Sequence, residues 1–143
     1  MVDKFSMGYE LLEHTADAKF EATGDSMEHA FSSAVDAFSE IVGGEGGQHR
    51  HKISIESESH EALLFDFLDE LIWLQDVEDV VISHAKSIEI EETDKGYKLE
   101  AVLWTNPITG DMTPTDVKGP TYSEMEMTYE KGTGWKIVAV LDM

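Results

Sequence analysis

Apolar residues recur along this chain with two different periods, and the switching between them limits the fold class. In residues 26–42 they stand three and four positions apart, which is typical of a helix that buries one side. Residues 61–75 carry a broader apolar face and are expected to form a second helix. Shorter segments are expected to form strands: residues 9–14, 18–23, 52–57, 80–91 (one long strand or two short ones), 97–104, 122–129 and 135–141. In residues 18–23 and 52–57 apolar and polar residues alternate, as in strands that bury one face, whereas residues 135–141 are strongly apolar.

The connections between these segments suggest how they are arranged. Asp94-Lys95-Gly96 is a hairpin signal, and residues 105–120 form a long loop that holds all three prolines. The resulting order is β-β-α-β-α-β-β-loop-β-β. It predicts an α+β two-layer sandwich, with two helices on one face of a mixed, largely antiparallel sheet of six or more strands. A length of 143 residues fits a single domain spanning residues 1–143.

The charge of the chain excludes one large class of partners. Asp and Glu number 30 against 10 Lys and Arg, which gives a formal net charge of −20. A nucleic-acid-binding face needs many basic side chains to replace the counterions of the phosphates, so we expect no direct nucleic-acid binding. Such a chain would instead attract basic proteins and cations. Adaptation to a salty cytoplasm, where ions screen the repulsion between acids, explains the acidity equally well.

Neither a membrane nor disulfide chemistry is expected. Residues 63–74 are the longest apolar-rich stretch, but acids interrupt them and they are shorter than the ~20 apolar residues of a membrane span. The chain has no cysteine, which excludes disulfides and thiolate chemistry. The first residues lack the apolar core of a signal peptide. We therefore expect a cytoplasmic protein.

No catalytic motif is present, and carboxylates are the only abundant reactive groups. Oxygen-rich clusters of carboxylates select hard cations such as Mg²⁺, Ca²⁺ or Mn²⁺. Asp17 lies in a turn after the first strand, and Asp142 follows a buried strand, where the terminal carboxylate of Met143 would join it. From composition alone, a turn cap for Asp17 and a solvated chain end for Asp142 are the simpler explanations. The acids of the second helix are expected to form a solvated face.

Several segments, in order, resemble the archease family over nearly the whole chain. The opening residues 9–17 read Tyr-Glu-Leu-Leu-Glu-His-Thr-Ala-Asp, and the closing residues 140–142 read Val-Leu-Asp. The other matching segments are residues 24–31, 64–74 and 116–122. The chain departs from the family pattern at Gly119, Pro120 and Ser123, and Ser123 stands where an imidazole is often found.

The resemblance implies a function and a site. Archease proteins assist a GTP-dependent, RtcB-type RNA ligase that joins tRNA halves, by promoting its guanylylation and multiple turnover. Family members bind a divalent metal, usually taken to be calcium, through acids that match Asp17 and Asp142; magnesium and manganese are alternatives. A lysine matching Lys118 is also important in the family, so Lys118 is expected to face the partner or contact a phosphate. The resemblance thus favours a metal site at Asp17 and Asp142, which the terminal carboxylate of Met143 would complete, in a protein that is not itself an enzyme.

Two other functions remain open at this stage. The family has also been linked to a tRNA cytosine methyltransferase, so this chain could be a chaperone-like modulator of such an RNA-modifying enzyme. That role would use the acidic surface without needing the metal. A free-standing metal-dependent hydrolase is disfavoured because no positioned base or nucleophile is evident in the sequence.

Overall fold

The computed structural model describes residues 8–12 and 17–143, which form two helices and seven strands. The helices are α1 (Met27–Val42) and α2 (His60–Glu78). The strands are β1 (Gly8–Leu12), β2 (Asp17–Gly24), β3 (His49–Ser57), β4 (Val80–Thr93), β5 (Gly96–Pro107), β6 (Gly119–Glu130) and β7 (Gly134–Asp142). Of the predicted strand at residues 9–14, residues 13 and 14 lie outside the described residues.

The strands form two antiparallel sheets. One sheet has the order β1-β2-β7-β6, and the other has the order β3-β5-β4. The predicted hairpin at Asp94–Gly96 joins β4 to β5, and the segment at residues 80–91 belongs to one long strand with two irregularities. The first sheet instead depends on a long-range pairing, because β2 from the start of the chain lies beside β7 from its end.

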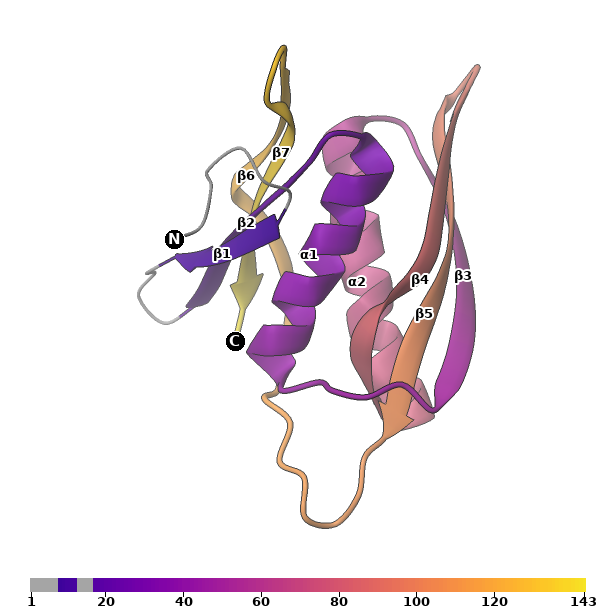
Figure 1. The fold of residues 1–143 in the computed structure, drawn as a ribbon, viewed down its shortest axis with the longest axis vertical. Coiled ribbons are helices and arrows are strands. Elements are labelled where there is room, and N and C mark those ends of the chain that lie inside the picture. Colours follow the sequence, from indigo (N-terminus) through magenta and orange to yellow (C-terminus); the bar gives the residue numbers. More distant parts are fainter. Residues whose placement is uncertain (1–7, 13–16) are drawn as a thin grey trace.

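The α+β class and the dominant antiparallel pairing are confirmed, but the arrangement of layers differs from the prediction. The strands divide between two sheets instead of forming one, and the helices lie between these sheets instead of covering one face (Figure 1). The burial of the helices explains this. Phe31 and Phe38 of α1 and Phe67 of α2 are fully buried, and the rings of Phe31 and Phe67 meet edge to face at 5.2 Å. Both helices contact strands of both sheets, so they need apolar cover on two sides.

The helix ends follow from local chemistry. Ser26 caps α1 by accepting a hydrogen bond from the His29 amide (3.1 Å), and Ser59 caps α2 in the same way. Gly43, the first residue of the glycine-rich segment 43–47, ends α1 in the left-handed region at φ 83°, which glycine adopts readily. The second helix continues past the predicted end at residue 75 and stops at Glu78. Its C-cap is Asp79, which adopts the left-handed conformation at φ 54°; since this residue is not a glycine, the sequence gives no clear signal of the helix end.

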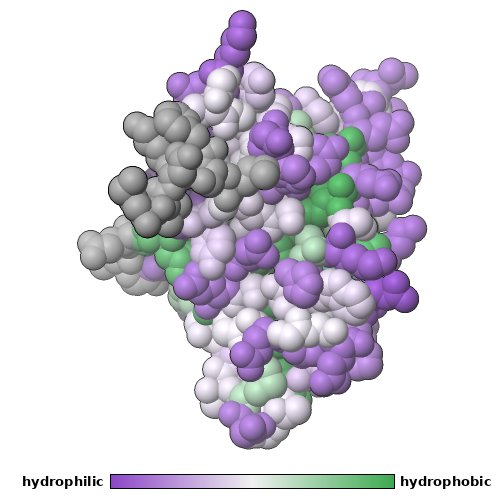
Figure 2. All heavy atoms as spheres, viewed as in Figure 1, coloured by the Kyte–Doolittle hydropathy of each residue, from purple (hydrophilic) through white to green (hydrophobic). Residues whose placement is uncertain are grey.

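The surface is consistent with the acidic composition. Figure 2 shows hydrophilic residues over most of the face nearest α1, with a hydrophobic area between α1 and the β4–β5 hairpin. Within residues 8–12 and 17–143, neither helix combines the length and the apolar character needed to cross a membrane.

Candidate functional site

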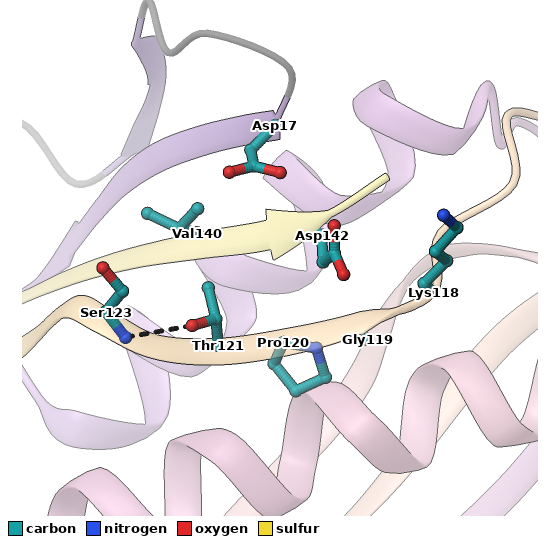
Figure 3. A pocket seen from close by; sticks show the side chains of 8 residues that line it. All are labelled: Asp17, Lys118, Gly119, Pro120, Thr121, Ser123, Val140 and Asp142. Carbon is teal, nitrogen blue, oxygen red and sulfur yellow. Dashed lines mark hydrogen bonds between the residues drawn. The ribbon is translucent and has the colours of Figure 1, made fainter.

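The register of the first sheet brings Asp17 and Asp142 together. Asp17 at the start of β2 is the direct partner of Asp142 at the end of β7, and Gly119 at the start of β6 pairs with Asp142 from the other side. Directly opposed residues of antiparallel strands project to the same face, with Cβ atoms about 4.5–5.5 Å apart. The two carboxyl groups therefore stand on neighbouring strands at one end of the sheet (Figure 3).

The face of the sheet that carries these acids points away from the helices. Ile137, Ala139 and Leu141 of β7 are buried in the core, so the alternate residues Val138, Val140 and Asp142 lie on the other face. Val140 is nevertheless only 1% exposed.

An ion pair crosses this face at Val140. Lys19 of β2 is the register partner of Val140, and its Nζ lies 3.2 Å from Oε1 of Glu124 on β6, at the far side of β7. The pair therefore spans three strands. It contributes to the cover over Val140 and ties β6 to β2 beside the two acids.

Glu124 can reach Lys19 because β6 bulges. Thr121 pairs with Val140 and Glu126 pairs with Val138, so residues 122–125 lie opposite Ala139 alone. Glu124 adopts φ 60°, which non-glycine residues rarely do. On the other side of this bulge, the ring of Tyr122 stacks on Phe65 of α2, with centroids 4.3 Å apart and planes 5° from parallel.

The bulge and the end of the loop enclose a pocket of about 290 Å³ next to the two acids. Lys118 approaches from the loop that connects β5 to β6, and its amide donates a 2.8 Å hydrogen bond to the carbonyl oxygen of Asp142. Ser123 lines the opposite wall, and its amide donates to Thr121 Oγ1 at 3.1 Å. The complete lining is Asp17, Lys118, Gly119, Pro120, Thr121, Ser123, Val140 and Asp142 (Figure 3).

The pocket thus gathers residues from the start of the chain, the end of the chain and the loop before β6. The model of the Archease protein family (MTH1598/TM1083) matches residues 9–143, which include all of these positions. This chain belongs to the archease family.

Individual relatives agree with this assignment. The protein archease of Methanosarcina mazei is 35% identical, over 94% of this chain and 95% of that protein. That of Pyrococcus abyssi is 32% identical, over 94% of this chain and 98% of that protein.

Two solved structures share the fold. The solution structure of protein 1598 from Methanobacterium thermoautotrophicum matches with a TM-score of 0.80 and 30% identity, over 95% of this chain and 99% of that one. The crystal structure of an archease from Thermotoga maritima, described as a possible chaperone, matches with a TM-score of 0.62 and 22% identity. It covers 92% of this chain and 94% of that one, and at this identity it supports the fold alone.

The donor set of this archease fits a hard divalent cation with open coordination positions. Two adjacent carboxylates supply the oxygen ligands that such cations prefer, and a cation between them would relieve the repulsion of directly opposed like charges. In residues 8–12 and 17–143, however, no group of three or more His, Asp or Glu side chains is placed to hold a metal. Asp17 and Asp142 would therefore need further oxygen ligands from water, the main chain or a partner.

The predicted site residues fall into two groups. Asp17, Asp142 and Lys118 line one pocket, although Asp17 is the first residue of β2 and does not lie in a turn. The remainder of the predicted connection, residues 14–16, lies outside the described residues. The side chain of Met143 packs against the core, and participation of its terminal carboxylate in the site stays a prediction.

Sequence reasoning missed the role of the β6 bulge. The segment Tyr122–Met125 reads as part of a regular strand, and the lack of Gly or Pro within it conceals the irregularity. The family resemblance singles out Ser123 only because an imidazole is missing there, whereas the bulge places Ser123 in the lining of the pocket. The pair Gly119-Pro120 at the start of β6 is the one sequence signal that favours an irregular strand here, because Gly and Pro within strands often accompany bulges.

Proposed function

We propose that this archease is a non-catalytic cofactor that activates a GTP-dependent, RtcB-type tRNA-splicing RNA ligase, promoting guanylylation of the ligase and its multiple turnover. Family membership supports a protein that acts on a partner. The observation that carries the proposal is the pairing of Asp17 with Asp142 beside Lys118, because it brings the three residues matched to the family's site into one pocket.

Charge supports a role beside an RNA-binding partner. A ligase that binds RNA needs a basic surface at its active-site entrance. A protein of net charge −20 is attracted to such a surface, and this attraction speeds encounter and fixes orientation. RNA itself would be contacted by the ligase, in the cytoplasm, and not by the archease.

Once the two proteins are docked, the pocket would hold a divalent cation close to the active site of the ligase. Asp17 and Asp142 would hold a divalent cation, calcium in the first instance, with magnesium or manganese as alternatives. When bound, such a cation supplies positive charge close to phosphate oxygens. Lys118 is exposed at the pocket edge, where its ammonium can pair with a phosphate or with a carboxylate of the ligase.

A ligation assay tests the proposal. Purified ligase in limiting amount is given cleaved tRNA and GTP, with and without the archease and divalent metal. Joined tRNA in excess of the ligase is expected only when the archease is present. The archease without ligase should join no tRNA, and a product yield that the archease leaves unchanged would contradict the proposal.

A second candidate function is a chaperone-like modulator of an RNA-modifying enzyme such as a tRNA cytosine methyltransferase. The observation that favours it is the net charge of −20, which would attract a basic partner without any metal, and the archease of Thermotoga maritima is described as a possible chaperone. This role requires the acidic surface but no metal. Protection of the methyltransferase from aggregation, undiminished by a chelator and by Asp142→Asn, would favour this candidate over the ligase cofactor.

A further inference from the structure

The solvent side of α2 exposes apolar side chains among acids. Trp73 and Val77 are each 54% exposed, while Asp69 and Asp76 are exposed beside them. Phe65 lies two turns before Trp73 and is half-buried. At 3.6 residues per turn these positions share one stripe of the helix. Folding gains little from an exposed Trp, so such a stripe is a sign of a binding surface.

This stripe contacts the β6 segment that also supplies pocket residues. Tyr122, which is 57% exposed, stacks on Phe65, and its neighbours Thr121 and Ser123 line the pocket. Figure 3 shows α2 running alongside the β6 segment that carries the pocket residues, and the two elements are in contact. We call Phe65, Asp69, Trp73, Asp76, Val77 and Tyr122 the α2 surface. From Phe65 to Val77 it extends about 18 Å along the helix.

The chemistry of the α2 surface selects its partner. Apolar side chains separated by carboxylates fit a basic surface that offers an apolar hollow for the indole of Trp73. A second copy of this chain is a poor occupant, because it would set Asp69 and Asp76 against acids of a protein with net charge −20. The apolar residues would set how long the complex lasts, and the acids would set how fast it forms.

We propose that the α2 surface is the docking site for the basic surface of the partner ligase next to its active-site entrance. This inference rests on the proposed ligase-cofactor function. It separates two tasks: α2 binds the partner, and the pocket of Asp17 and Asp142, which shares residues 121–123 of β6 with the neighbourhood of the α2 surface, acts on it.

The separation predicts different defects in binding and in activation. Trp73→Ser should raise the Kd for the ligase by ~10-fold or more, since aromatic anchors are typical hot spots, and Val77→Ser should raise it by a smaller factor. Guanylylation should return to the wild-type level when these variants are supplied at saturating concentration. Asp69→Asn combined with Asp76→Asn should slow association at low salt and weaken its dependence on ionic strength.

Two control variants make the experiment specific. Tyr129→Ser removes an equally exposed aromatic (59%) outside the α2 surface and should leave the Kd unchanged. Asp142→Asn should bind with the wild-type Kd but fail to stimulate guanylylation. Isothermal titration calorimetry with purified ligase provides the Kd, and thermal unfolding verifies that each variant folds.

The outcomes distinguish this inference from the function on which it rests. If wild-type archease binds and stimulates the ligase while Trp73→Ser and Val77→Ser bind as tightly as wild type, the docking site is overturned and the cofactor function stands. Absence of any complex between wild-type archease and the ligase overturns both. A wild-type dimer that Trp73→Ser dissociates would also overturn the inference, in favour of self-association through this surface.

Discussion

Asp17 and Asp142 are direct partners across β2 and β7, so the second and the last strand of the chain place two carboxylates side by side. Directly opposed like charges destabilise a sheet. Here the repulsion arises beside a pocket, where a bound divalent cation would remove it.

Metal binding should therefore appear as a gain in stability. We expect excess calcium to raise the Tm of the wild-type protein by ~3 °C or more, because a ligand that binds only the folded state stabilises it. Asp142→Asn should abolish this shift. In metal-free buffer the same variant should be as stable as the wild type, or slightly more so. Differential scanning calorimetry with and without chelator measures both effects.

A matched control exists in the same sheet. Glu10 of β1 and Glu21 of β2 are also directly opposed acids, away from the pocket. Glu21→Gln should retain the full calcium-dependent shift. An equal loss of the shift in Glu21→Gln and Asp142→Asn would show that calcium binds to the acidic surface in general, which would contradict a specific site.

The glycine-rich segment after α1 should tolerate substitution poorly. A Cβ at Gly44 would lie 1.9 Å from the carbonyl oxygen of Ile82 and 2.7 Å from Ser39 Oγ. We expect Gly44→Ala to lower the free energy of unfolding by about 2–3 kcal/mol, because the main chain of β4 has to move. Gly110→Ala is the matched control, since a Cβ there meets nothing within 4 Å. Urea denaturation should show no loss of stability for Gly110→Ala, and similar losses in both variants would contradict this packing.

The β6 bulge makes a prediction about backbone conformation. Glu124 has φ 60°, a conformation that costs a residue with a Cβ about 1–2 kcal/mol and glycine almost nothing. Glu124→Gly and Glu124→Ala both lose the ion pair with Lys19. The glycine variant should nevertheless be the more stable of the two, by ~1 kcal/mol in chemical denaturation. Equal stability would mean that residue 124 is not left-handed in solution.

Tyr9 should ionise at a higher pH than a tyrosine ordinarily does. A hydrogen bond to the Glu40 carboxylate, assisted by burial, raises the pKa of Tyr9 from 10.0 to about 12. Because the pKa is higher in the folded state, the stability from this bond is present below pH 10 and is lost as the pH rises through about 12. A spectrophotometric titration should show a late tyrosine ionisation in the wild type that moves to lower pH in Glu40→Gln, where the bond is lost. Identical titration curves for the wild type and Glu40→Gln would contradict the bond.

Local features of the fold could be predicted from the sequence, and the long-range ones could not. The stripe of α1 and the hairpin at Asp94–Gly96 depend on residues that are close in the chain. Alternation identifies which face of a strand is buried, but it does not identify the neighbouring strand. The division into two sheets and the pairing of β2 with β7 therefore became visible only in the structure.

The candidate site shows the same limit. Composition alone favoured unremarkable positions for Asp17 and Asp142, and the family resemblance pointed to them without giving a geometry. The strand register supplies the geometry, because it makes Asp17 and Asp142 direct partners on one face of the sheet. The ion pair of Lys19 with Glu124 was not predictable, since it depends on a bulge at residues 122–125, where no Gly or Pro marks the position.

The most direct test of the account is guanylylation of limiting RtcB-type ligase by radiolabelled GTP, in the presence of wild-type archease or of folded Asp17→Asn, Asp142→Asn and Lys118→Met variants. We predict that wild type stimulates guanylylation and that each variant loses at least ~10-fold of this stimulation, about 1.4 kcal/mol of the activation free energy. Glu21→Gln should stimulate as well as wild type. Full stimulation by the Asp17→Asn and Asp142→Asn proteins would contradict the claim that the paired acids form the functional site.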